Sequence, residues 1–131
     1  MAAVPKQLVR DWMTPSAITV GPAQPLGDAQ GLMEELAIRR LAVVDNDKLV
    51  GILSLGDVLA AHSSVDGAMP ETVAEAMTPH PVTITEDASI GLAAQTLLSL
   101  KVSGLPVVNE SGTLSGVLSE SDLFRYIVSL S

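Results

Sequence analysis

Hydrophobic residues recur along the chain with two different periods, and the same succession of periods occurs twice. Short apolar runs at residues 17–20 and 82–85 predict strands, and apolar positions at helical spacing over 26–36 and 88–100 predict a helix after each strand. Two apolar runs joined by a tight turn then predict a β-hairpin in each half, and a second helix follows the hairpin. Each half is therefore predicted as β-α-β-β-α, with hairpin strands at 41–45, 48–53, 105–109 and 113–118 and second helices at 56–61 and 121–130.

The residues repeat together with the pattern. The offset between the copies is 64 residues up to Asp47 and 65 after it, so the second copy has one inserted residue near Gly112. A repeat of this length exceeds the solenoid periods and predicts two small subdomains packed as a pair. Three segments carry the match: Met13-Thr14-Pro15 returns as Met77-Thr78-Pro79, Leu41-Ala-Val-Val44 as Leu105-Pro-Val-Val108, and Gly51-Ile-Leu-Ser-Leu-Gly-Asp57 as Gly116-Val-Leu-Ser-Glu-Ser-Asp122.

The repeat defines the domain organisation that we expect. We assign the first repeat to residues 1–62, a linker containing serine, glycine and proline to 63–71, and the second repeat to 72–131. A short helix is predicted to resume at 72–75 and to end before Pro79, because proline is not accommodated inside a helix. Each repeat has only about 60 residues and would bury little core alone, so the halves are predicted to share one core.

Composition narrows the classes of function. A net charge of −8 repels nucleic acid and anionic membranes, and three aromatic residues are too few for a surface that stacks bases. No apolar run approaches the ~18 residues of a membrane span, and the N-terminus lacks the blocks of a secretory signal, so we expect a cytoplasmic protein. The chain has no cysteine, and neither His62 nor His80 has a partner at metal-ligand spacing, so no metal site is predicted.

The most specific local pattern is Ser-x-x-Asp at the junction of an apolar strand and a helix, at Ser54–Asp57 and Ser119–Asp122. One interpretation is structural, because a serine followed by an acid three residues later forms a capping box. The other is a binding site, because the same corner exposes the backbone N–H groups of a helix start. Both copies use the short acid Asp where a capping box prefers Glu or Gln, and a short carboxylate can accept from the vicinal hydroxyls of a ribose.

Weaker candidates lie near these corners. Arg39 and Arg40 are the only adjacent basic pair and the best phosphate partners in an acidic chain, although a solvated surface explains them equally well. Their counterparts are Ser103 and Gly104, which carry no charge. The chain has no phosphate-binding glycine motif and no nucleophile beside a base, so we do not expect an enzyme.

The ordered set of motifs, found twice, closely resembles the cystathionine β-synthase (CBS) domain, and two copies in tandem resemble a Bateman module. The resemblance covers about residues 8–130. It implies an α+β fold in which two β-α-β-β-α repeats pack through their sheets with pseudo-twofold symmetry. It also implies clefts between the repeats for adenosine-containing ligands such as AMP, ADP, ATP or S-adenosylmethionine, with no cofactor required.

The resemblance further implies roles for residues of this chain. The motif acid holds the ribose hydroxyls and the motif serine lies near ribose or phosphate, while the backbone at the start of the hairpin meets adenine and a first-strand threonine contributes. Ala42 departs from the family pattern, which has the proline found at Pro106, so the two clefts are expected to differ. The implied ligand-binding residues are Asp57, Ser54, Thr19, Arg40 and Leu41 in one copy, and Asp122, Ser119, Thr83, Gly104 and Leu105 in the other.

Two functions remain open at the level of sequence. The leading hypothesis is a nucleotide sensor, often a disc-like homodimer in this family, whose state is read by a partner protein because no residues are left for an effector domain. The alternative is a dimerisation or protein-interaction module without a ligand, in which the Ser-x-x-Asp pairs only cap helices. The sequence names neither the nucleotide nor the partner.

Overall fold

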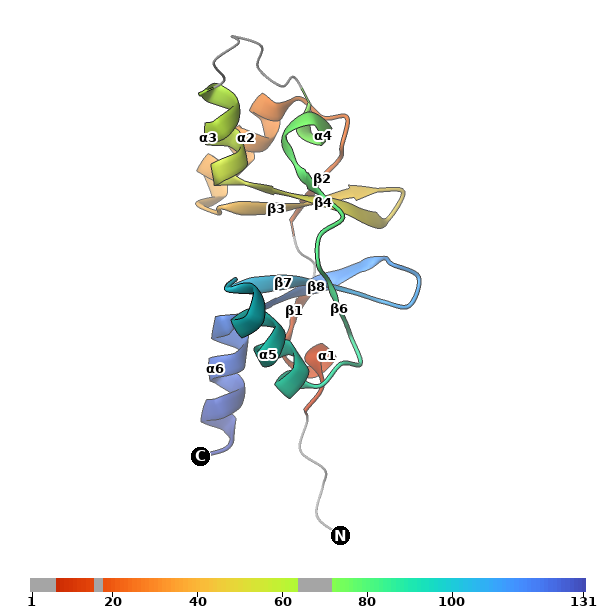
Figure 1. The fold of residues 1–131 in the computed structure, drawn as a ribbon, viewed down its shortest axis with the longest axis vertical. Helices are drawn as coiled ribbons and strands as arrows, with labels where there is room; N and C mark the ends of the chain where they lie inside the picture. The colour runs from red at the N-terminus through yellow and green to blue at the C-terminus, as the bar shows by residue number, and fades with distance from the viewer. Residues whose placement is uncertain (1–6, 16–17, 64–71) are drawn as a thin grey trace. The chain divides into compact units, whose positions relative to one another are not determined.

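The computed structural model describes residues 7–15, 18–63 and 72–131, which form two compact units (Figure 1). The contiguous unit consists of Ile18–Pro81, and the composite unit combines Met1–Ala17 with Val82–Ser131. Each unit contains one four-stranded sheet, and helices cover one face of it. The chain is thus an α+β protein with two sheets, as the repeated pattern predicted.

The contiguous unit has the strand order β2-β3-β4-β5. The first two strands are parallel, and the remaining pairs are antiparallel. The hairpin turn has positive φ at Asn46 and Asp47, a conformation that these short polar residues tolerate. Its elements are β2 (Thr19–Val20), α2 (Leu26–Leu36), β3 (Arg40–Asp45), β4 (Lys48–Ser54), α3 (Leu55–His62), α4 (Val73–Ala76) and β5 (Thr78–Pro79).

The composite unit has the matching order β1-β8-β7-β6. Strands β6 and β7 are parallel, and β7, β8 and β1 are antiparallel neighbours. Gly112 has φ 82° in the hairpin turn, a conformation that glycine adopts without the steric cost of a Cβ. The elements are α1 (Val9–Trp12), β1 (Thr14–Pro15), β6 (Ile84–Thr85), α5 (Ile90–Leu100), β7 (Gly104–Val108), β8 (Leu114–Ser119) and α6 (Glu120–Ser129).

The predicted helices and hairpins are confirmed, and the helix at 26–36 has the predicted bounds. The predicted strands at 17–20 and 82–85 are shorter than expected, because only two residues of each pair with the neighbouring parallel strand. Residue 17 and the linker residues 64–71 lie outside the described part of the chain.

The Met-Thr-Pro segments form strands that the hydrophobic pattern did not predict. Each lies at a sheet edge, where proline's missing N–H is tolerated. In β1, Pro15 is the register partner of Gly116 in β8; in β5, Pro79 is the partner of Gly51 in β4. Each sheet therefore takes its edge strand from the other sequence repeat, and the packed units are composed differently from the repeats.

This exchange explains why both Gly-h-h-Ser-x-x-Asp motifs begin with glycine. A Cβ placed on Gly116 would overlap the carbonyl oxygen of Thr14 and lie 3.1 Å from the Cα of Pro15. A Cβ on Gly51 would overlap the sulfur of Met77 and lie 3.1 Å from the carbonyl oxygen of Thr78. The motif glycine is thus required by the close approach of the Met-Thr-Pro strand.

Most of the buried hydrophobic side chains among the described residues belong to two clusters, one in each unit, so the prediction of one core shared by both halves was wrong. Each unit instead completes its own core with a segment from the other repeat. Val9, fully buried, joins the core of the composite unit, and Val73, also fully buried, joins that of the contiguous unit. The backbone N–H of Val9 donates to Ala88 O at 2.9 Å, and that of Val73 donates to Gln24 O at 2.9 Å.

One stability prediction follows from the end of α2. Ala37 caps this helix with φ 54° and ψ 43°, in the left-handed region that disfavours a Cβ. We expect Ala37→Gly to raise the free energy of unfolding by about 0.5–1 kcal/mol, measured by urea denaturation. Ala60→Gly, in the exposed interior of α3, is the matched control and is expected to lower it by about 1 kcal/mol. A loss of stability in both variants would contradict the capping role.

Candidate functional site

The junction of β4 and α3 forms the first Ser-x-x-Asp corner. Ser54 is the N-cap with an extended backbone, and its Oγ accepts from the backbone N–H of Asp57 at 3.0 Å. In return, Asp57 Oδ2 accepts from the backbone N–H of Ser54 at 2.9 Å, which completes a capping box. The other carboxylate oxygen, Oδ1, makes no hydrogen bond within the part of the chain that the structure describes. This corner is capped and still presents a carboxylate oxygen as an acceptor.

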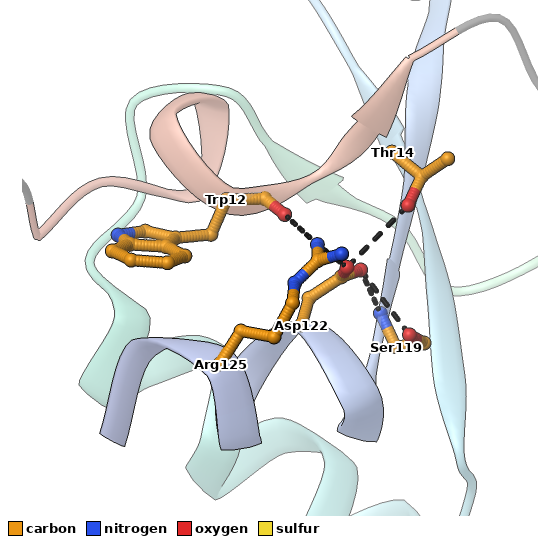
Figure 2. Close-up of polar contacts among 5 residues, drawn as sticks. All are labelled: Trp12, Thr14, Ser119, Asp122 and Arg125. Atoms are coloured by element: carbon orange, nitrogen blue, oxygen red, sulfur yellow. Dashed lines mark hydrogen bonds and ion pairs between the residues drawn. The ribbon is translucent and has the colours of Figure 1, made fainter. Parts of the chain in front are cut away.

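The junction of β8 and α6 forms the second corner, where the acid is more heavily engaged. Asp122 Oδ2 accepts from the backbone N–H of Ser119 at 2.8 Å and from the Ser119 hydroxyl at 3.2 Å. Its Oδ1 accepts from the Thr14 hydroxyl at 3.4 Å and pairs with the guanidinium of Arg125 (Figure 2). The side chain of Asp122 is only 2% exposed. Both oxygens of this acid are therefore occupied by the protein itself.

The strand register brings three of the predicted residues of the first copy to one face of their sheet. Arg40 is the register partner of Ser54, and Thr19 is the partner of Ala42, two residues after Arg40. Because side chains alternate along a strand, Arg40, Ser54 and Thr19 share the face opposite the one that carries Leu41. Leu41 is 1% exposed and packs in the core, so only its backbone is available to a ligand.

The second copy brings fewer of its predicted residues together. Gly104 is the register partner of Ser119, as Arg40 is of Ser54. Leu105 packs in the core at 3% exposure. Thr83 precedes β6, so it lies outside the strand pairing that Thr19 enters. Thr83 and Thr19 therefore occupy equivalent positions in the two repeats, but only Thr19 is part of a paired strand.

Three residues of the second corner were missed by the sequence analysis. Arg125 lies three residues after Asp122 on the same helix, a spacing that favours an ion pair and was available as a signal. Thr14 is 108 residues away in the chain, and no local pattern indicates its contact. The carbonyl oxygen of Trp12 accepts from the Arg125 guanidinium at 3.4 Å, and the Trp12 ring lies edge-on to that of Tyr126 at 5.4 Å.

The described residues contain neither a metal-ligand cluster nor a helix suited to a membrane. Within residues 7–15, 18–63 and 72–131, His, Asp and Glu side chains form no group of three that would hold a metal ion. His62 Nε2 lies 2.8 Å from Gln30 Oε1 in a hydrogen bond between exposed side chains. No helix in these ranges has the length and apolar character that crossing a membrane requires.

Comparison with known proteins identifies relatives that match most of the chain. The family model for the CBS domain matches residues 9–64 and 73–129. An inosine-5'-monophosphate dehydrogenase of Korarchaeum cryptofilum is 36% identical over 107 residues, which are 82% of this chain and 21% of that enzyme. The chain thus spans about a fifth of the length of this relative.

Solved structures with the same fold contain adenosine compounds. The crystal structure of CBSX2 from Arabidopsis thaliana in complex with AMP is 30% identical, with a TM-score of 0.86 over 95% of this chain and 98% of that one. The CBS domain pair of protein MJ0100, in complex with 5'-methylthioadenosine and S-adenosyl-L-methionine, is 26% identical, with a TM-score of 0.79 over the same shares.

Proposed function

Because the chain belongs to the CBS-domain family, with two such domains in tandem, we propose that it is a cytoplasmic regulatory module that binds an adenosine-containing ligand and signals to a partner protein. Its two repeats are residues 1–62 and 72–131, joined by residues 63–71. The ligand class is AMP, ADP, ATP or S-adenosylmethionine, and it acts as a signal rather than as a cofactor. The catalytic activity of the dehydrogenase relative is not carried over, because the match covers only 21% of that enzyme.

The observation that carries the proposal is the corner at Ser54 and Asp57. The vicinal hydroxyls of a ribose are hydrogen-bond donors, and Asp57 Oδ1 is an acceptor that the capping box leaves unused. The capping box holds the carboxylate in place before the ligand arrives, which lowers the entropy lost on binding. Thr19, Arg40 and the backbone of Leu41 contribute further polar groups from the same end of the sheet.

Net charge shapes which ligand is preferred. The chain carries −8, so each phosphate group on a nucleotide adds repulsion that local basic groups must offset. Arg40, the first residue of β3, is the register partner of Ser54, and Arg39 directly precedes it in the chain. S-adenosylmethionine carries a sulfonium cation and avoids this repulsion.

Isothermal titration calorimetry with AMP, ATP and S-adenosylmethionine tests the proposal. We expect saturable binding of at least one compound, and a rise in melting temperature with its concentration, because a ligand that binds only the folded state stabilises it. Asp57→Asn should weaken binding by tenfold or more, on the order of one charged hydrogen bond. Asp47→Asn, an acid in the hairpin turn, is the matched control. Folded protein that binds none of the three compounds would refute the proposal.

A second candidate, an interaction module without a ligand, is favoured by the capping boxes themselves. Both acids accept backbone hydrogen bonds at helix starts, which accounts for the Ser-x-x-Asp pattern without any ligand. The calorimetric experiment separates the candidates, because this alternative requires that no adenosine compound changes the melting temperature.

We also propose that the module forms a homodimer through α6. Phe124, Ile127 and Val128 lie at helical spacing on this helix and are 61%, 58% and 70% exposed, an apolar stripe that a second copy would cover. Ile127→Asp is expected to shift the protein from dimer to monomer in sedimentation equilibrium without unfolding it. Ser129→Asp, which adds the same charge at the end of α6, should leave the dimer intact. A wild-type protein that is monomeric at high concentration would contradict this proposal.

A further inference from the structure

The two Ser-x-x-Asp corners differ in the residues that surround the acid. Arg125 and Tyr126 follow Asp122 on α6, and the offset of 65 places Ala60 and Ala61 at the same positions after Asp57. Trp12 precedes the first Met-Thr-Pro strand, and the offset of 64 places Ala76 at its counterpart. The arginine that pairs with Asp122 and the two aromatic residues whose rings contact each other beside it are therefore all alanine in the contiguous unit.

Arg125 pairs with the second acid and also donates to the backbone carbonyl of Trp12, which attaches the N-terminal segment to this corner. Thr14 and Trp12 come from residues 7–15, while Asp122 and Arg125 come from α6, and the four converge in Figure 2. A ribose that used Asp122 would have to displace the guanidinium with neutral hydroxyl donors. The hydroxyl groups carry no net charge, so the exchange would lose the Coulombic attraction between the guanidinium and the carboxylate and is unfavourable.

Burial further raises the free energy needed to separate Asp122 from Arg125 at the second corner. Asp122 is 2% exposed, whereas the Arg125 side chain is 62% exposed and shields the acid from solvent on one side. Separating the pair would leave a buried carboxylate without its cation, which is strongly destabilising. Asp57, by contrast, is half-buried and has Ala60 in place of the arginine, so nothing on its own helix competes with a ligand for Oδ1.

We infer that Asp122, Arg125 and Thr14 form a clasp that fixes the N-terminal segment to the composite unit, and that of the two motif acids Asp57 alone accepts from a ribose. The module then binds one adenosine-containing ligand per chain, at the Asp57 corner. The single-site part of this inference rests on the proposed function, and the clasp does not. Arg125 therefore determines which corner binds the ligand. It blocks the Asp122 corner, which would otherwise be equivalent to the Asp57 corner.

The clasp is tested without any ligand through Trp12, the only tryptophan of the chain. Arg125→Ala should increase acrylamide quenching of Trp12 fluorescence and lower the melting temperature, because it removes the bonds that hold residues 12–14 against α6. Arg10→Ala, which removes the same charge from α1, the helix that contains Trp12, is the matched control and should change neither. Equal quenching in wild type and Arg125→Ala would overturn the clasp.

The single-site inference is tested by moving the arginine. Ala60→Arg places a guanidinium three residues after Asp57, and it should weaken AMP binding by about tenfold or more while the melting temperature is kept or raised. Ala60→Gln, similar in length and uncharged, should bind AMP as the wild type does. This variant does not depend on disrupting a buried pair, so failure to fold is not an expected outcome.

Calorimetric stoichiometry with AMP gives the decisive result. The wild type should bind one equivalent per chain, Asp57→Asn should lose it, and Asp57→Asn combined with Arg125→Ala should regain binding at the opened second corner. Two equivalents in the wild type, or unchanged AMP affinity in Ala60→Arg, would overturn the single-site inference. If no variant binds AMP, ATP or S-adenosylmethionine, the proposed function fails together with the single site, while the Trp12 experiment still decides the clasp.

Discussion

Gly116→Ala is expected to lower the free energy of unfolding by about 3 kcal/mol, the largest effect that we expect from adding a single methyl group. The new Cβ would overlap the carbonyl oxygen of Thr14 and approach the Cα of Pro15 at 3.1 Å. Both are backbone atoms of β1, so the strain cannot be relieved by rotating a side chain. The strand must move away from β8, and its ladder with Val117 and Gly116 is lost. Urea denaturation measures the change.

Gly51→Ala is the matched comparison in the other unit. Its Cβ would overlap chiefly the side chain of Met77, which has three rotatable bonds and is able to shift, although the carbonyl oxygen of Thr78 lies 3.1 Å away. We expect a loss of about 1–2 kcal/mol, smaller than for Gly116→Ala. Equal losses at both glycines would mean that the approach of β1 to β8 is not the source of the requirement for glycine.

The second large effect concerns the exchange of segments between the repeats. A chain of residues 82–131 alone is expected to remain unfolded, because the composite unit needs residues 7–15 for its edge strand and part of its core. Val9, Trp12 and Met13 pack in that core, and the carbonyl oxygen of Gln7 accepts from the backbone N–H of Ile90 at 2.8 Å. A unit of about 60 residues is too close to marginal stability to lose this many contacts.

Residues 18–81 alone provide the comparison, because the contiguous unit contains all its strands and its whole core cluster in one stretch of chain. Circular dichroism should show cooperative thermal unfolding for residues 18–81 and none for 82–131. Adding a peptide of residues 1–17 to 82–131 should restore a cooperative transition. A cooperative transition of 82–131 without the peptide would contradict the dependence on the exchanged segment.

Much of the fold was predictable because it is encoded locally. The helix at 26–36 has three buried residues at helical spacing, Leu26, Ala29 and Met33, and its period alone was enough to find its bounds. The hairpins follow from apolar runs around residues that tolerate positive φ, such as Asn46 and Gly112. The capping boxes follow from Ser and Asp at a fixed spacing of three residues.

The strands β1 and β5 were not predictable in this way. Each has two residues, too few to show an alternating pattern, and each contains a proline that indicates a break. Their partners lie in the other repeat, and hydrophobic periodicity carries no information on which distant edge a segment joins. The motif glycines Gly51 and Gly116 were visible in the sequence, but the reason for them was not.

The sequence by itself therefore determined the repeated β-α-β-β-α order, the family and the two candidate corners, since each depends on residues a few positions apart. Only the tertiary structure decided that the repeats exchange their Met-Thr-Pro strands and that each unit has its own core. It also decided the difference between the corners, because Asp122 accepts from Thr14, 108 residues away in the chain, while Asp57 Oδ1 has no hydrogen-bond partner among the residues that the structure describes. The physical reason is that hydrophobic periodicity and helix capping depend on residues a few positions apart. Which segment pairs with the edge of a sheet is decided instead by the packing of the whole unit.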